Sequence, residues 1–247
     1  MNTFLEKLAK EDNPGKRLDL IDEALRPPEP QVLDTCVLQN LDWVDRRIEE
    51  AGSVIWDDIT ITDLKQKYGA DLADDLIDLG TLYKEFEYRG GYPWLVCKAS
   101  VEEASLFQGE KGDRLRGLLR FLIGHQRDWS MDAYPGIAGG LLLDANPNHV
   151  SPLILKALNV KKAKEVHSET GPLAFIPDRG DRKIAAVALL SNIPIVLTSD
   201  RATFWKHRES LKEMGLQIMR PSELLSLYLP YWNAMNVEFK RRHVQKY

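Results

Sequence analysis

Short apolar runs alternate with segments of helical periodicity along most of the chain. Residues 31–34, 94–97, 195–197 and 217–219 are short runs of strand length that consist mainly of apolar or β-branched residues. After the first run, apolar residues recur every three or four positions between 37 and 48, which predicts a helix. Strands that alternate with helices of about ten residues predict an α/β fold with a mostly parallel central sheet.

Weaker patterns predict further elements. Helices are expected at 71–79, 100–107, 114–123, 153–166, 181–191 and 201–214, and extended segments at 54–56, 59–61 and 173–176. The aspartates within 71–79 are interpreted as the solvated face of an amphipathic helix rather than as a cation site.

Prolines mark the start of the main domain. The proline-rich stretch at 27–30 ends a polar helical segment, because no helix continues through it. We therefore expect an N-terminal helical extension at 1–30, a main domain at 31–226 and a C-terminal extension at 227–247.

Composition narrows the class of protein. The 33 Lys and Arg residues against 37 Asp and Glu give a formal charge of −4, which excludes a protein that coats nucleic acid by bulk charge. Only two cysteines occur, Cys36 and Cys97, so reduced thiols rather than a disulfide framework are expected. No apolar run approaches the roughly 18 residues of a membrane span, and residues 1–10 lack the apolar core of a signal peptide. We expect a cytoplasmic protein without membrane contact.

Acidic residues follow four of the predicted strands. Asp34 and Asp200 stand after 31–33 and 195–197, and Glu103 and Asp181 stand in the first turns of helices that follow two other strands. Ligands of open parallel sheets bind at the carboxyl ends of the strands, so these carboxylates are expected to meet. Clustered carboxylates need a cation, and oxygen ligands favour Mg²⁺ or Mn²⁺. Such an ion promotes in-line hydrolysis of phosphodiesters.

Each acid also has a structural interpretation. Ser100 and Glu103 have the S-x-x-E spacing of a capping box, Asp181 and Asp200 precede helices as N-caps do, and Asp34 fits a turn. Four acids at four strand-to-helix junctions are less easily explained by capping alone.

Several segments resemble the motifs of PIN-domain nucleases. V-L-D-T-C-V-L at 32–38 resembles the opening L-D-T-x-V-L of that family, and S-V-E-E-A at 100–104 is similar to its central T-x-x-E-L. D-R-K-I-A-A at 181–186 and I-V-L-T-S-D at 195–200 are similar to D-x-x-I-A-A followed by a strand and T-x-D. The last pair is the most specific part of the resemblance, and the order of elements agrees from about 31 to 226.

The resemblance implies a three-layer, Rossmann-like PIN domain with a central, mostly parallel sheet. It implies a Mg²⁺- or Mn²⁺-dependent ribonuclease with catalytic, metal-binding carboxylates at Asp34, Glu103, Asp181 and Asp200 and supporting hydroxyls at Thr35 and Thr198. Many members are toxins paired with antitoxins and others process RNA. RNA, an antitoxin or regulatory protein, and by general default a homodimer are therefore the expected partners.

The chain departs from compact members of that family in its spacing. Asp34 and Glu103 are 69 positions apart, and Glu103 and Asp181 are 78 apart, which is longer than in compact members. Helical insertions are therefore expected at about 45–92 and 108–170.

Two positions have a competing neighbour. Glu102 competes with Glu103, which we prefer because it stands three residues after Ser100. Asp178 competes with Asp181, which we prefer because only Asp181 has the family's offset to the following I-A-A.

Other residues carry weaker signals. Arg116 and Arg120 lie on a leucine-rich helical segment, and either solubilise it or, with Arg201, contact the phosphates of a nucleic acid. Trp205 and His207 are interpreted as a core aromatic and a surface histidine rather than as stacking or proton-transfer groups.

Two other functions compete with a nuclease. A haloacid dehalogenase-type phosphatase needs a second acid two residues after the first, where Cys36 stands, and we interpret that cysteine as a packing residue. A nuclease-like module that binds nucleic acid or protein without turnover would be expected to lose a carboxylate, and none of the four is missing. We therefore expect a single-stranded endoribonuclease, although only the family's habit distinguishes RNA from single-stranded DNA.

Overall fold

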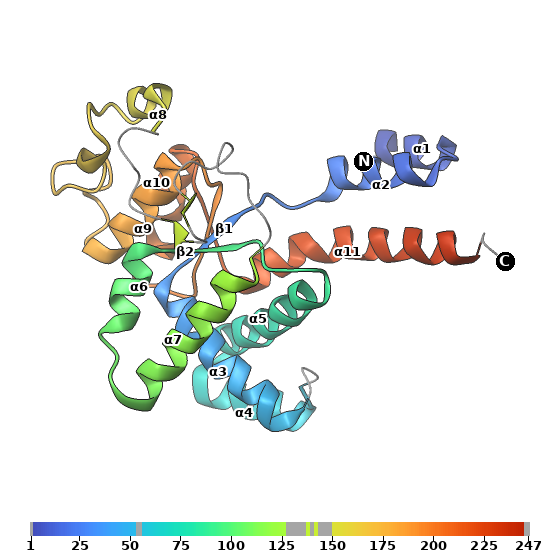
Figure 1. Ribbon diagram of the computed structural model, residues 1–247, viewed down its shortest axis with the longest axis horizontal. Helices are drawn as coiled ribbons and strands as arrows, with labels where there is room; N and C mark the ends of the chain where they lie inside the picture. The colour runs from blue at the N-terminus through green and yellow to red at the C-terminus, as the bar shows by residue number, and fades with distance from the viewer. Residues whose placement is uncertain (1, 53–55, 127–136, 139–140, 143–149, 245–247) are drawn as a thin grey trace. The chain divides into compact units, whose positions relative to one another are not determined.

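A computed structural model describes residues 2–52, 56–126, 137–138, 141–142 and 150–244. The chain divides into two units, Met1–Pro28 with Glu223–Tyr247, and Glu29–Ser222. Within the described residues, the larger unit contains a six-stranded sheet with the strand order β3-β4-β2-β1-β5-β6 (Figure 1). The expected α/β fold with a mostly parallel sheet is confirmed.

The central strand of the sheet is the first one in the sequence. β1 (Gln31–Leu33) pairs in parallel with β2 (Trp94–Cys97) on one side and with β5 (Ile195–Leu197) on the other. All residues of these three strands are buried, as expected for apolar strands covered on both faces. Leu33 is level with Leu197 and with Val96, so the carboxyl ends of the three strands share one edge.

The outer strands are shorter or only partly buried. β6 (Gln217–Met219) pairs in parallel with β5, and the two-residue strand β4 (Leu141–Leu142) pairs in parallel with β2. β3 (Ile137–Ala138) pairs with β4 in the antiparallel direction.

Helices directly follow the strands β1 and β2. β1 leads into α3 (Thr35–Ala51), and β2 leads into α6 (Lys98–Ser105), which is followed by α7 (Gly109–Gly124). The other helices described in this unit are α4 (Asp58–Tyr68), α5 (Ala70–Tyr88), α8 (Pro152–Ala157), α9 (Arg179–Leu190) and α10 (Arg208–Glu213), with 3₁₀ turns η1 (Ala163–Glu165) and η2 (Trp205–His207).

Packing joins the helices to the sheet. α3 contacts α5, α6 and α7, and α9 contacts β5, α6 and α8. One core cluster contains Val32 of β1, Leu95 of β2, Val196 of β5 and Ile184 of α9, all fully buried. The carboxyl ends of the strands and the first turns of α3, α6 and α9 are therefore held by one packed core.

The expected extended segment at 59–61 is wrong, because these residues lie in α4. Asp57 caps this helix, and its carboxylate accepts a hydrogen bond from the Thr60 amide at 2.6 Å. The cap outweighs the strand preference of the β-branched residues. Of the neighbouring prediction at 54–56, positions 54 and 55 lie outside the described residues.

The expected strand at 173–176 is also wrong. Leu173 and Ile176 are fully buried, but their backbone forms turns in which the Ile176 amide donates to the Leu173 carbonyl at 3.0 Å. Pro172 and Pro177 bracket these four residues, so burial of two side chains is achieved without a strand partner. Asp181 therefore follows a series of turns rather than a strand.

Two expected helices are shorter than predicted. The helix expected at 153–166 ends with α8 at Ala157, and Asn159 follows with a left-handed φ of 52°. Of the helix expected at 201–214, only Arg208–Glu213 is α-helical, after turns and η2.

The acidic segment of α5 is more than a solvated face. Asp75 is fully buried, and its carboxylate accepts hydrogen bonds from Arg220 Nε at 2.9 Å and Ser222 Oγ at 3.1 Å. The exposed Asp71 pairs with Arg201. The expectation of a solvated face is therefore wrong at Asp75, which anchors α5 to the residues after β6.

The smaller unit consists of helices. α1 (Asn2–Lys10) and α2 (Pro14–Leu25) are joined at Asn13, which caps α2 by accepting the Gly15 amide at 2.8 Å. α11 (Pro221–Val244) belongs to this unit from Glu223 onward. Arg17 Nε donates to Glu238 of α11 at 2.8 Å, with both side chains nearly buried. Of the helices that the structure describes, none has the length and apolar character needed to cross a membrane.

Candidate carboxylate site

Asp34 lies at the carboxyl end of the central strand and is almost completely buried. Its Oδ1 accepts the Thr35 amide at 2.6 Å, and its Oδ2 accepts the Thr198 hydroxyl at 2.7 Å. Burial is the main reason that the pKa of Asp34 is raised, and the nearby Asp200 carboxylate adds to it. The residue is also the N-cap of α3, so its structural interpretation and its place in a site are compatible.

Asp200 is held on the loop that follows the neighbouring strand β5. Its amide donates to the Thr198 hydroxyl at 2.9 Å, and its Oδ1 accepts the Ala202 amide at 2.7 Å. The hydroxyl of Thr203 donates to the other carboxylate oxygen. Thr198 therefore bridges the loops of Asp34 and Asp200, and its expected supporting role in a metal site stays a prediction.

Cys36 is more than a packing residue. Its thiol donates to Asp34 Oδ2 at 2.9 Å, lies 3.4 Å from Thr198 Oγ1, and accepts the Ser199 amide at 3.2 Å. Burial, followed by the negative charge of Asp34, raises the pKa of the Cys36 thiol well above its ordinary value. The thiol therefore stays protonated and acts as a hydrogen-bond donor, not as a nucleophile.

Asp181 and Asp178 have different roles at the start of α9. Asp178 is the N-cap, because its Oδ1 accepts the Asp181 amide at 3.0 Å. The pKa of Asp181 is raised to about 7, mainly by burial and also by the charges of Asp34, Asp178 and Asp200, against the opposing effect of a hydrogen bond with Thr203. Asp181 is therefore the acid of this turn that lies within electrostatic range of both strand-end carboxylates.

Glu103 reaches the first turn of α9. A Cβ atom placed on Gly180 would overlap Glu103 Oε1 and lie 3.2 Å from Glu103 Cδ, so this carboxylate is in close contact with the backbone of Gly180. The same Cβ atom would lie 3.0 Å from Asp178 Oδ1. Glu103 is thus placed beside the turn that carries Asp181.

The capping-box interpretation of Glu103 is wrong. α6 begins at Lys98 and is capped by Cys97, whose sulfur accepts the Ser100 amide at 3.4 Å. The Ser100 hydroxyl instead donates to the Leu33 carbonyl at 3.3 Å, which ties α6 to the end of β1.

The competing Glu102 is paired elsewhere. Its carboxylate is exposed and lies 3.7 Å from Lys98 Nζ and 3.6 Å from Lys183 Nζ. These ion pairs, together with the contact of Glu103 at Gly180, favour Glu103 as the member of the site.

The four carboxylates share one region without forming a ready metal site. Within the part of the chain that the structure describes, no three His, Cys, Asp or Glu side chains form a group able to hold a metal ion. Two buried hydroxyls at the same strand ends, Thr35 Oγ1 and Ser199 Oγ, have no hydrogen-bond partner among the described residues. The donor set consists of oxygens, which suits Mg²⁺ or Mn²⁺, and the two hydroxyls leave polar capacity for a ligand or water.

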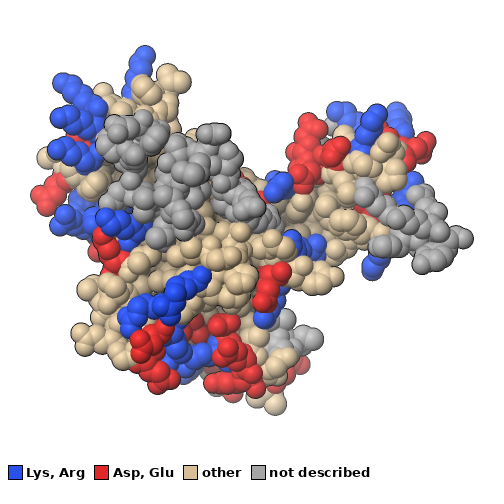
Figure 2. All heavy atoms as spheres, in the orientation of Figure 1, with Lys and Arg blue, Asp and Glu red and all other residues tan. Residues whose placement is uncertain are grey.

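The basic residues expected to contact phosphates are engaged in ion pairs or lie on a mixed surface. Arg116 pairs with Asp113 at 2.6 Å, and Arg201 pairs with Asp71 of α5. Arg120 is exposed on α7. Acidic and basic side chains are interspersed over α7 in Figure 2, so this helix presents no patch of a single charge there.

The aromatic residues after Asp200 are packed against neighbours. Trp205 packs against the buried core, as expected for a core aromatic, and the Arg208 guanidinium lies 4.1 Å from the centroid of its ring. The partly exposed His207 meets Phe175 edge-on, with 5.4 Å between ring centroids.

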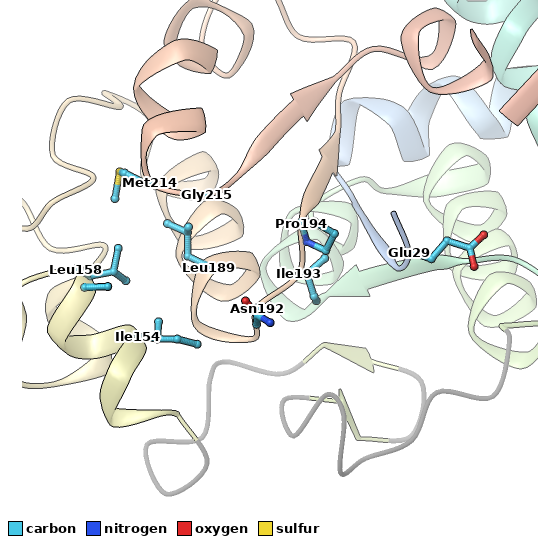
Figure 3. A pocket seen from close by; sticks show the side chains of 10 residues that line it. Glu29, Ile154, Leu158, Leu189, Asn192, Ile193, Pro194, Met214 and Gly215 are labelled. Carbon is cyan, nitrogen blue, oxygen red and sulfur yellow. The ribbon is translucent and has the colours of Figure 1, made fainter. Parts of the chain in front are cut away.

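A separate pocket of about 450 Å³ lies at the opposite edge of the sheet. Figure 3 shows Ile154, Leu189 and Met214 among its apolar lining residues. Glu29 and Pro194 of the lining stand just before β1 and β5, at the amino ends of the strands. The pocket contains none of the four carboxylates and is not part of the candidate site.

Sequence reasoning missed three contributors to the site. Thr203 stands three residues after Asp200, where a hydroxyl can hydrogen bond to the carboxylate, and this spacing was a usable signal. Gly180 lies in the first turn of a helix, where alanine is the better helix former. A glycine at such a position indicates that another group approaches its backbone closely. The role of Cys36 depends on the Ser199 amide 163 positions away and had no local signal.

Comparison with protein-family models, with curated proteins and with solved structures found no match to this chain.

Proposed function

We propose that this protein is a divalent-metal-dependent nuclease that hydrolyses phosphodiester bonds, with single-stranded RNA as its first candidate substrate. Asp34, Glu103, Asp181 and Asp200 are its proposed ligands for Mg²⁺ or Mn²⁺. The proposal includes the three-layer, Rossmann-like arrangement of a PIN domain.

One observation carries the proposal: carboxylates from three distant segments lie within electrostatic range of each other at the carboxyl edge of a parallel sheet. Burial is the main reason that the pKa of Asp181 is raised to about 7, and the negative charges of Asp34 and Asp200 both contribute to the rise. Such an arrangement is unfavourable without a counterion, so it supports a site for a cation. Glu103, in contact with the turn of Asp181, is the fourth proposed donor.

The cation and the hydroxyl residues around it would have different roles in the proposed reaction. A bound divalent cation stabilises charge on the phosphate and leaving oxygens and promotes attack by water. Thr198 and Thr203 orient Asp34 and Asp200 by donating hydrogen bonds to their carboxylates. These hydrogen bonds fix the donor oxygens before substrate arrives, which lowers the cost of reorganisation during the reaction.

A binding module without turnover is the second candidate function. It is favoured by the finding that the described residues contain no ready group of three metal-binding side chains. Such a module would bind nucleic acid or protein at the same edge and would not need the cation. The expected antitoxin or regulatory partner and the homodimer remain predictions under either function.

The test is cleavage of labelled single-stranded RNA, structured RNA and single-stranded DNA in the presence of Mg²⁺, Mn²⁺ or EDTA. Asp34→Asn and Asp181→Asn should reduce metal-dependent cleavage at least about a hundred-fold, because each removes a charge from the cation site. Asp178→Asn is the matched control, since asparagine also caps helices and should retain activity. Folding of each variant is checked by its melting temperature.

The outcomes separate the two functions. Cleavage that needs metal and is lost in both site variants supports the nuclease. Cleavage that survives EDTA or either substitution refutes the proposed site. Absence of both cleavage and Mn²⁺ binding by calorimetry, with RNA binding retained, supports the binding module instead.

A further inference from the structure

Cys36, like Thr198, joins the loops of the two strand-end carboxylates. The residue lies in the first turn of α3, two positions after Asp34. Its sulfur is 2.9 Å from Asp34 Oδ2 and 3.2 Å from the amide nitrogen of Ser199, the residue before Asp200. One side chain therefore contacts the carboxylate that follows β1 and the backbone that follows β5.

The chemistry of the two partners fixes the direction of both hydrogen bonds. An ionised carboxylate only accepts hydrogen bonds, so the proton between Cys36 and Asp34 is the thiol proton. A backbone amide only donates, so the sulfur accepts from Ser199. The thiol uses its donor and its acceptor capacity at the same time, and an apolar side chain would deprive the Ser199 amide of this acceptor and Asp34 Oδ2 of one of its two donors.

These contacts divide the two oxygens of Asp34. Oδ2 accepts from the Thr198 hydroxyl and from the Cys36 thiol, whereas Oδ1 accepts from the Thr35 amide. A carboxylate oxygen accepts about two hydrogen bonds, so Oδ2 is saturated and Oδ1 keeps one lone pair. The oxygen left for a cation is therefore Oδ1.

We propose that Cys36 is a positioning residue of this site, which holds Asp34 with Oδ1 available to the cation and keeps the Asp200 loop at a fixed distance. This inference rests on the proposed metal-dependent function. Positioning partners of metal ligands typically change metal affinity about 10- to 100-fold when they are removed.

The experiment measures Mn²⁺ binding by calorimetry and the metal concentration that gives half-maximal cleavage, in the full chain. Cys36→Ala should raise the dissociation constant for Mn²⁺ and the half-maximal metal concentration, each about ten-fold. Cys36→Ser should stay within about three-fold of the wild type, because a hydroxyl also donates to a carboxylate and accepts an amide. Cys36→Val, which fills the space without a donor, serves as a second variant in case Cys36→Ala does not fold.

Cys97→Ala is the matched control. Cys97 is also buried, and its sulfur also accepts a backbone amide, that of Ser100, but its hydrogen bonds are with Ser100 and not with a carboxylate of the site. This variant should lose stability without changing the metal dependence. A merely structural role for Cys36 would make the two cysteine variants behave alike.

Three results would overturn the inference. Unchanged metal dependence in a folded Cys36→Ala or Cys36→Val variant shows that the hydrogen bond positions nothing. Loss in Cys36→Ser as large as in Cys36→Ala shows that donor and acceptor capacity is not what matters. A wild-type protein that neither binds Mn²⁺ nor cleaves removes the proposed function itself, and is recognised before any variant is made.

Discussion

Gly180→Ala tests whether Glu103 belongs to the site. The added methyl group would overlap Glu103 Oε1 and lie 3.2 Å from Cδ, inside the usual 3.4 Å contact limit. The carboxylate must therefore move by about 1 Å, and displacements of that size in an active site cost up to about 10²-fold in rate. Alanine is favoured over glycine in a helix by about 1 kcal/mol, so folding should not suffer.

The assay compares cleavage and melting temperature in Gly180→Ala with the same two quantities in Gly117→Ala. Gly117 lies within α7, and a Cβ atom there meets nothing within 4 Å, so this control gains helix propensity without a clash. We expect cleavage to fall about 10- to 100-fold in Gly180→Ala only. Because both changes act through Glu103, adding Gly180→Ala to Glu103→Gln should cause little further loss. Wild-type cleavage in a folded Gly180→Ala variant would refute the placement of Glu103 beside α9.

Two further predictions concern α5. Burial raises the pKa of Asp78 from 3.8 to about 6; since the folded value is the higher one, stability is lost as pH rises from about 4 to about 6. In urea titrations, Asp78→Asn should thus raise the free energy of unfolding by about 1 kcal/mol at pH 8, a value reduced for the partial exposure of the side chain, and by little at pH 4. Substitution of an exposed aspartate, Asp63→Asn, is the control. Equal gains at the two pH values in Asp78→Asn would contradict the raised pKa of Asp78. Arg220→Met should lower the free energy of unfolding by about 3 kcal/mol, because the carboxylate of Asp75 stays buried without this partner. Arg201→Met breaks an exposed pair and should lower it by less than about 1 kcal/mol. Equal losses in the two variants would disprove this difference between the buried and the exposed pair.

The central strands were predictable because each is a short apolar run whose neighbours change character abruptly. Residues 31–33 and 195–197 have no helical periodicity and no local capping signal, so the pattern had one interpretation. At 59–61 the β-branched residues favoured a strand, but one aspartate at position 57 capped a helix. At 173–176 apolar residues are buried by tertiary contacts from turns, which no local pattern distinguishes from a strand.

The candidate site was predictable where the acid adjoins a strand. Asp34 and Asp200 follow paired strands, so topology alone places them at one edge. The approach of Glu103 to Gly180 and the contact of Cys36 with Ser199 join residues 77 and 163 positions apart. Such contacts depend on how α6, α9 and α3 pack, and periodicity contains no information about them.

The central position of β1 has a consequence for folding of the chain during translation. Gln31 pairs with Trp94 and also with Ile195, which follows it by 164 residues. At about 5–20 residues per second, translation needs roughly ten to thirty seconds to deliver that second partner. During this time one edge of β1, a strand that is fully buried in the folded protein, stays unpaired, and such unpaired edges are prone to aggregation. We therefore expect chaperones to bind the nascent chain until residue 197, the last residue of β5, has left the ribosome.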